Sequence, residues 1–216
     1  MLCTENYDKF NIYLGTPTTT LYCGPSCLNQ SWLDSSGVLA FWPFEGSFID
    51  RTGVYNGTPI RNSPTFVTGY IGQAASFNAS AQQALRTPFI PLNAVSFTVE
   101  TWINPTGYPN PSDLSIVGLC PAHIINECLH INIRSEKLYF GFFYDDIQGS
   151  TTLALNQWIH ATFMYDFAAK TKVIYYNGFA DTAISASNEL NVQSGNFTIG
   201  TNDQVNYPEN YFQVII

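Results

Sequence analysis

Short runs in which apolar and polar residues alternate are the feature that most constrains the fold of this chain. Residues 95–99 (VSFTV), 129–133 (LHINI) and 159–165 (IHATFMY) all place apolar residues at their odd positions. Successive side chains of a β-strand point to opposite faces, so each run is typical of a strand with one face toward a core. Residues 138–144 (LYFGFFY) are apolar almost throughout, which predicts a strand covered on both faces.

The composition agrees with an all-β chain and excludes some partners. Aromatic residues make up 15% of the chain and suit a pleated surface, while charged residues make up only 11%. The formal net charge is −8, and the eight Lys and Arg residues are scattered, so we expect no nucleic-acid partner. No run approaches the roughly 20 apolar residues of a membrane span, so we expect no membrane insertion by this segment.

The chain divides into two parts by pattern. Residues 1–36 contain Cys3, Cys23 and Cys27 and a Thr-rich patch, without a sustained hydrophobic period. They are predicted to be an irregular leader or stalk remnant, and the pairing of their cysteines is left open. From residue 37 to 216, short apolar runs alternate with turn residues, which predicts a single folded domain.

The cysteines and the glycosylation sequons point to an oxidising compartment. The chain has five cysteines, and sequons begin at Asn29, Asn56, Asn78 and Asn196. We therefore expect a secreted protein or the extracellular part of a larger one, glycosylated at these positions. The first residues show neither the basic nor the apolar region of a signal peptide.

Several motifs, taken in order, resemble the laminin G-like, concanavalin A-like lectin family. They are residues 37–46 (GVLAFWPFEG), 97–103 (FTVETWI), 155–161 (LNQWIHA), 176–178 (YNG) and 197–200 (FTIG). The resemblance runs from residue 37 to about 204 and implies an antiparallel two-sheet jelly-roll β-sandwich. It also implies recognition of a glycan or an extracellular protein, a choice that the fold alone does not make.

The C-terminus departs from the family pattern. Members usually continue with a closing strand that carries a Gly-x-Ile-Asp motif, whereas residues 211–216 read YFQVII. We therefore expect the closing strand to be absent or altered, in a domain truncated at its C-terminus that exposes a self-associating sheet edge. The alternative is that these six residues themselves form the final strand.

No catalytic pattern is present, so the chain is predicted to be a binding or adhesion module and not an enzyme. Related sandwich glycosidases carry paired carboxylates at alternate positions of one strand, and that spacing is missing. Asp145 and Asp146 are adjacent, so on a strand they would point to opposite faces. The alternatives are a glycosidase-like enzyme on the same scaffold and a truncated fragment without independent function.

Cys120 and Cys128 have two interpretations. They are predicted to form a disulfide that closes a short loop between strands. Together with His123 and His130 they could instead supply the four ligands of a zinc ion. The expected compartment favours the disulfide.

Asp50 and Asn56 are candidate calcium ligands that the resemblance suggests. Calcium prefers carboxylate and carbonyl oxygens, but the Asp of the family's closing strand is missing, so the expected affinity is weak or nil. The competing interpretation is that Asp50 hydrogen-bonds the backbone of its own turn.

Trp42, Trp102 and Trp158 could form a platform on which sugar rings stack. Each lies in a motif that the resemblance assigns to a structural strand, so we expect all three to pack in the core.

Overall fold

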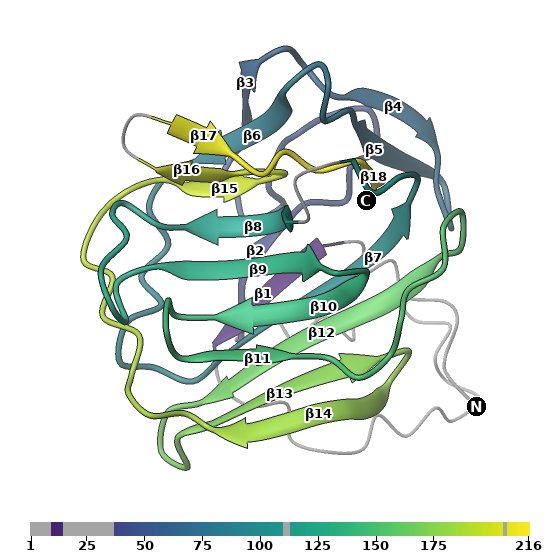
Figure 1. Cartoon of the computed structure of the whole chain (residues 1–216). Helices are drawn as coiled ribbons and strands as arrows, with labels where there is room; N and C mark the ends of the chain where they lie inside the picture. The colour runs from purple at the N-terminus through teal and green to yellow at the C-terminus, as the bar shows by residue number, and fades with distance from the viewer. Residues whose placement is uncertain (1–9, 15–36, 110–112, 205–206) are drawn as a thin grey trace, which may run out of the picture.

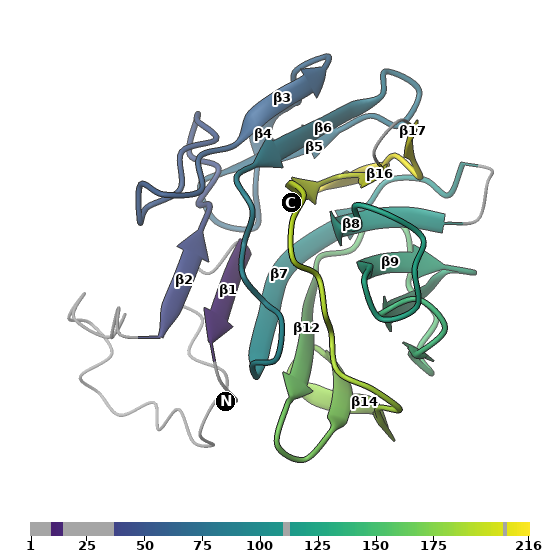
Figure 2. The same ribbon diagram turned by 90° about the vertical axis from the view of Figure 1, so that its left-hand side faces the viewer.

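The computed structural model describes residues 10–14, 37–109, 113–204 and 207–216. Within these ranges every regular element is a β-strand, so none of them contains a helix that could cross a membrane. The strands form two antiparallel sheets that pack face to face, as Figures 1 and 2 show from two sides. The predicted all-β sandwich is therefore confirmed.

The larger sheet has nine strands in the order β14-β13-β12-β7-β18-β5-β4, with β1 between β7 and β2. Their bounds are β1 Phe10–Leu14, β2 Val38–Phe41, β4 Thr65–Thr68, β5 Gln73–Phe77, β7 Phe97–Pro105, β12 Ile159–Asp166, β13 Thr171–Tyr176, β14 Phe179–Ser185 and β18 Val214–Ile215.

The smaller sheet has seven strands in the order β11-β10-β9-β8-β15-β6-β3, and β16 and β17 form a separate pair. Their bounds are β3 Thr58–Arg61, β6 Gln83–Thr87, β8 Asp113–Leu119, β9 Leu129–Arg134, β10 Lys137–Gly141, β11 Asp146–Gln148, β15 Phe197–Ile199, β16 Asn202–Gln204 and β17 Tyr207–Glu209.

The core lies between the sheets and is built by the alternation seen in the sequence. Ile159, Ala161 and Phe163 of β12 are all buried, as the odd positions predict. Trp42 stacks on Phe197 across the core, and its indole N–H donates to the Tyr55 carbonyl at 2.9 Å. This hydrogen bond satisfies the polar atom of a fully buried tryptophan.

The polar face of β9 differs from its expected exposure. His130 and Asn132 alternate with the core residues as predicted, yet both are also buried. Ser115 of β8 donates to the Asn132 side chain at 2.9 Å, and the His130 ring is covered by Tyr139 and Phe143. Contacts between neighbouring strands, which the sequence of one strand does not reveal, exclude water from His130 and Asn132.

Strand β1 corrects the predicted N-terminal boundary. Phe10–Leu14 was expected to belong to an irregular leader, but it pairs with both β2 and β7, and Ile12 is buried in the core. A strand of five residues without a longer pattern around it gives little periodic signal. The other residues of the expected leader lie outside the described ranges.

Strand β18 corrects the prediction of an exposed edge. Val214 pairs with Phe77 of β5 on one side and with Pro105 of β7 on the other. Val214 and Ile216 are buried in the core. The closing strand is thus altered, as expected, but YFQVII supplies it and leaves no gap between β5 and β7.

Candidate binding site

Five planar side chains contact one another in a row on the outer face of the seven-stranded sheet. In spatial order they are Asp113, Arg134, Tyr139, His130 and Asp146, and together we call them the polar strip. They come from β8, β9, β10 and β11, which are neighbours in the sheet. Along each strand these residues alternate with residues that point into the core, so the strip is anchored to the rigid part of the fold.

Arg134 holds one half of the polar strip. Its Nε and Nη2 atoms each donate to one oxygen of Asp113, both at 2.6 Å. Such paired, charge-assisted hydrogen bonds fix the plane of the guanidinium. Its Cζ atom lies 3.8 Å from the centroid of the Tyr139 ring, a cation–π contact.

His130 and Asp146 form the other half. The His130 ring stacks on Tyr139, with centroids 5.6 Å apart, and its Nε2 lies 3.3 Å from Asp146 Oδ1. Gly141 pairs with both residues, and a Cβ atom there would collide with the same two atoms. Only glycine at this position leaves room for the contact between His130 and Asp146.

Electrostatics within the strip keep Asp146 ionised. Burial by itself would raise the pKa of Asp146. Its close contact with His130 and that residue's charge, with lesser contributions from Tyr139 and Lys172, nevertheless hold the pKa below its usual value. Burial and the nearby Asp146 raise the pKa of the Tyr139 hydroxyl, which therefore stays protonated at neutral pH.

The polar strip is accessible at its ends. The side chains of Arg134, Asp113 and Asp146 are 36%, 21% and 22% exposed. Tyr144, in the turn between β10 and β11, is 78% exposed beside the Asp146 end. The strip therefore offers water-facing carboxylate oxygens, guanidinium N–H groups and an aromatic ring, which together suit hydrogen bonding to the hydroxyl groups of a ligand.

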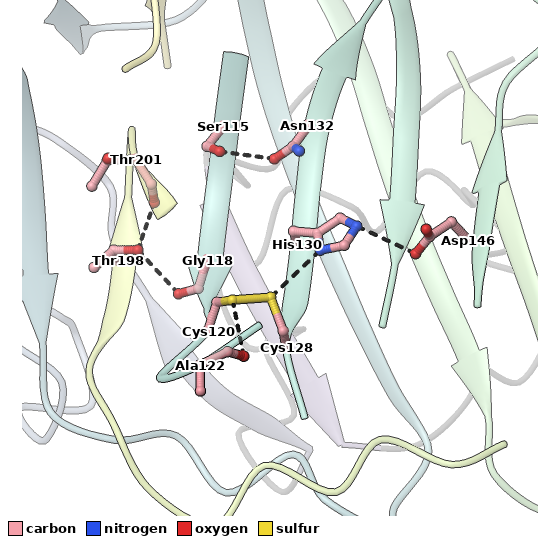
Figure 3. Close-up of a disulfide and its surroundings, with 10 residues drawn as sticks. All are labelled: Ser115, Gly118, Cys120, Ala122, Cys128, His130, Asn132, Asp146, Thr198 and Thr201. Atoms are coloured by element: carbon pink, nitrogen blue, oxygen red, sulfur yellow. Dashed lines mark hydrogen bonds and ion pairs between the residues drawn. A yellow bond between two sulfur atoms is a disulfide. The ribbon is translucent and has the colours of Figure 1, made fainter. Parts of the chain in front are cut away.

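Other polar side chains of this face are satisfied internally. Figure 3 shows Ser115 bonded to Asn132, and the Thr198 hydroxyl in contact with the carbonyls of Gly118 and Thr201. All four of these polar side chains, counting that of Thr201, are buried. They stabilise the sheet and do not belong to the exposed site.

The predicted disulfide between Cys120 and Cys128 is present and lies next to the polar strip (Figure 3). It joins the ends of β8 and β9, with Cα atoms 4.0 Å apart, and His130 Nδ1 lies 3.6 Å from Cys128 Sγ. Both sulfur atoms are used by the bond, and His123 stacks on Phe143. The alternative of a zinc site is therefore wrong for this arrangement.

Asp145 and Asp146 point to opposite faces, as their adjacency predicted. Asp145 is buried against Lys172, with Oδ2 and Nζ 3.0 Å apart, whereas Asp146 faces His130 on the outer surface. The two carboxylates cannot act together on one glycosidic bond, because a glycosidase needs both beside the same bond.

Asp50 is a fully buried acceptor in its own turn. Its two oxygens accept the backbone N–H groups of Phe41, Thr52, Val54 and Tyr55, and also the Thr52 hydroxyl. This geometry matches the interpretation of Asp50 as a turn residue, since the lone pairs that would bind a cation already accept hydrogen bonds. Calcium binding at Asp50 and Asn56 stays a prediction.

The sequon asparagines within the described ranges, Asn56, Asn78 and Asn196, are exposed. Asn56 Oδ1 accepts the Asp50 N–H at 3.0 Å, and Asn78 Oδ1 accepts the Ala81 N–H at 3.0 Å. Glycans attach to the other side-chain atom, Nδ2, so these contacts are compatible with glycosylation, which stays a prediction. Asn29 lies outside the described residues.

The three tryptophans of the predicted platform divide between core and surface. Trp42 is in the core as predicted, but the prediction is wrong for Trp102 and Trp158, which lie partly exposed on the outer face of the nine-stranded sheet. There they contact Tyr70 and His160, and we call these four residues the aromatic cluster.

Comparisons with known proteins agree with the fold. A family model described as "Concanavalin A-like lectin/glucanases superfamily" matches residues 78–216. No curated protein matches the chain by sequence.

Three solved structures illustrate the likeness. Domain 4 of the extracellular GH43 arabinanase AbnA from Geobacillus stearothermophilus, in complex with arabinotriose, has a TM-score of 0.59 and 19% identity, covering 80% of this chain and 85% of that domain. The binding domain of Paraclostridial Mosquitocidal Protein 1 has a TM-score of 0.58 and 16% identity, covering 77% of this chain and 44% of that one. Domains LG4-5 of the mouse laminin alpha1 chain have a TM-score of 0.54 and 13% identity, covering 72% of this chain and 42% of that one. The chain thus spans less than half of the second and third structures, and at these identities the likeness concerns the fold alone.

Proposed function

Because the chain belongs to the concanavalin A-like lectin/glucanase superfamily, we propose that it is a non-catalytic binding module that recognises a glycan at the polar strip. The superfamily includes both binding domains and enzymes, so membership does not choose between them. The choice comes from the side chains on the outer face.

The polar strip is the observation that carries the proposal. Sugars present many hydroxyl groups that both donate and accept hydrogen bonds, and the strip presents ionised acceptors and guanidinium donors in fixed positions. Arg134 is fixed by Asp113 and Tyr139, so binding would cost little side-chain entropy. The structural likeness to a domain in complex with arabinotriose supports a carbohydrate as the ligand.

The arrangement of carboxylates supports binding without turnover. Asp145 is engaged by Lys172 in the interior, and the lowered pKa of Asp146 makes it a poor general acid near neutral pH. A glycosidase acid needs a raised pKa so that it still carries its proton.

An extracellular location is part of the proposal. The disulfide between Cys120 and Cys128 favours an oxidising compartment, and the exposed sequons at Asn56, Asn78 and Asn196 agree with it. We propose that the domain works as one module of a secreted or cell-surface protein.

A printed glycan array, followed by titration of the bound glycans, tests the function. Arg134→Ala removes the guanidinium donors near one accessible end of the strip and should weaken binding about tenfold or more. Arg51→Ala is the matched control, because Arg51 is an exposed arginine in the Asp50 turn, away from the polar strip. Both variants should be checked for folding by thermal unfolding.

Arg134→Ala leaves Asp113 unpaired, which could itself destabilise the fold. A second variant therefore separates the loss of charge at the site from a loss of stability. Asp113→Asn combined with Arg134→Gln removes both charges while keeping groups that can hydrogen-bond each other. We expect this variant to fold and to bind weakly. If either folded variant binds every glycan that the wild type binds with unchanged affinity, the ligand lies elsewhere and the proposal is overturned.

A further inference from the structure

The aromatic cluster lies on the opposite side of the sandwich from the polar strip, on the outer face of the nine-stranded sheet. Tyr70 stacks on Trp102, with ring centroids 4.2 Å apart and 12° between the ring planes. The ring centroids of Trp158 and Tyr70 are 6.2 Å apart, with 58° between the ring planes. The ring centroids of His160 and Trp102 are 5.1 Å apart. Tyr70 and Trp102 are thus nearly parallel, while the Trp158 ring is inclined to Tyr70 and the His160 ring to Trp102.

The fold fixes these rings in place. Trp102 of β7 and His160 of β12 are directly paired across the two strands, and their neighbours Ile103 and Ile159 point into the core. Trp158 lies two residues before His160, so both are expected on the same face.

Tyr70 reaches Trp102 from the turn between β4 and β5. The Gly69 N–H donates to the Gly72 carbonyl at 2.9 Å across this turn. Glu45 accepts the N–H of Gln73, the first residue of β5, at 3.1 Å. A turn held at both ends presents the Tyr70 ring with little freedom left to lose on binding.

The ring nitrogens of Trp102, Trp158 and His160 have no hydrogen-bond partner among the described residues. None of these atoms is among the buried polar atoms that lack a partner. Trp42 shows the contrast, since its N–H is bonded inside the core. Buried indoles normally find such a partner, so indole N–H groups without one, beside partly exposed rings, indicate a contact surface.

We propose that the aromatic cluster is a second glycan site, which takes the apolar face of a neutral sugar ring against Tyr70 and Trp158 and its hydroxyl groups at the indole and imidazole nitrogens. Aromatic rings with a few polar atoms at their edges are typical of small-ligand sites. The cluster contains no charged side chain, because burial lowers the pKa of His160 to about 4 and the ring is neutral at neutral pH. A neutral imidazole offers one donor and one acceptor.

The size of the cluster favours a sugar over a protein partner. Among its members only Tyr70 is exposed by more than a third, at 47%. A stable protein interface needs about 800 Å² from each partner, far more than these four side chains present. One or two sugar rings match the available surface.

Glycan binding by variants of the whole chain tests this site independently of the polar strip. The probe is a printed array of neutral and acidic oligosaccharides, followed by titration of the neutral glycans that bind, with tryptophan fluorescence as the signal. In the Arg134→Ala background, binding of a neutral glycan should persist. Adding Tyr70→Ala or Trp158→Ala should weaken it about tenfold.

Two further variants keep the result interpretable. Tyr70→Leu retains an apolar cover on Trp102 but removes the ring, and should weaken binding while leaving thermal stability close to that of the wild type. Phe179→Ala removes a ring that is 78% exposed on β14 of the same sheet and should have no effect. The proposal is overturned if Arg134→Ala binds no neutral glycan, or if folded Tyr70→Leu and Trp158→Ala bind as the Arg134→Ala parent does. If Arg134→Ala binds every glycan, acidic ones included, with the affinity of the wild type, that result would count against the polar strip and not against the aromatic cluster.

Discussion

Tyr70 covers one face of Trp102, with the two rings 4.2 Å apart and nearly parallel. The contact brings the turn between β4 and β5 over the centre of the nine-stranded sheet, where Trp102 would otherwise be a large apolar side chain in water. Trp42, Trp102 and Trp158 therefore contribute differently to stability, and substitutions should show the difference.

Trp42→Ala should cost far more stability than Trp158→Ala. Trp42 is fully buried and hydrogen-bonded, so its removal should lower the free energy of unfolding by about 3–5 kcal/mol. Trp158 is partly exposed, so its removal should cost about 1–2 kcal/mol. Denaturant unfolding of both variants checks this. Equal losses would mean that Trp158 packs in the core after all.

The positions of these tryptophans were readable in part from the sequence. The odd residues of 95–99 and 159–165 face the core, so the even-numbered Trp102, Trp158 and His160 belong on the outer face, as found. The motif resemblance outweighed this signal and led to the wrong expectation. Tyr70 could not be placed, because its contact depends on how two distant strands are arranged.

The polar strip, too, could be predicted from the sequence only in part. Alternation predicted that His130 and Arg134 lie on the polar face of their strand. The pairing of β8 with β9 and of β9 with β10 brings Asp113 and Tyr139 beside them. Which residues of neighbouring strands are paired depends on the whole sheet, so it cannot be predicted from the short runs of single strands. The disulfide, by contrast, was predictable, because its cysteines flank a short turn-like segment and the expected compartment is oxidising.

Asp50→Ala should destabilise the domain strongly. The substitution leaves four backbone N–H groups without their acceptor, two of them on the buried residues Phe41 and Tyr55, which should cost about 3–5 kcal/mol. Asn56→Ala removes a single acceptor of the same turn and should cost about 1 kcal/mol. Thermal unfolding of the two variants compares these losses of stability. A mild effect of Asp50→Ala would contradict the role of Asp50 as the acceptor of these N–H groups.

Calcium should leave the melting temperature of the wild type unchanged at sub-millimolar concentration. The Asp50 oxygens already accept hydrogen bonds, and any site there lacks further carboxylates among the described residues. Thermal unfolding with calcium and with a chelator measures this directly. A calcium-dependent rise that Asp50→Asn abolishes would instead establish a metal site.

Stability should fall as the pH is lowered from about 6.5 to about 4, in part because of His160. Burial lowers the pKa of His160 to about 4, below the ordinary value of 6.5, so in this window the unfolded chain binds a proton that the folded chain does not. The loss should be on the order of 2–3 kcal/mol and level off below pH 4. His160→Gln should flatten the pH dependence of unfolding in this window. An unaltered profile would show that the ring protonates freely in the fold.

Replacing both Cys120 and Cys128 by Ala should lower the free energy of unfolding by about 2–3 kcal/mol, because the crosslink restricts the unfolded chain. Glycan binding at the polar strip should weaken as well, since His130 loses its neighbour Cys128. Denaturant unfolding under non-reducing conditions gives the first value. A double variant as stable as the wild type would show that β8 and β9 need no crosslink.

Removing residues 214–216 should unfold or aggregate the domain. Val214 bridges β5 and β7, so its loss leaves unpaired N–H and C=O groups on both strands and opens the core at Ile216. Sedimentation should show self-association of the shortened chain and a monomer for the full chain. A shortened chain that stays monomeric and melts like its parent would contradict the role of β18.

The proposal of binding without catalysis is tested most directly by one incubation. A glycan selected on the array is mixed with the wild-type domain, and the bound fraction and newly formed reducing ends are measured in the same sample over time. For a glycan whose binding on the array depends on Arg134, we expect saturable binding that Arg134→Ala weakens, with no reducing ends above those of a protein-free control. Release of reducing ends that scales with protein concentration, or the absence of binding to every glycan, would contradict the account.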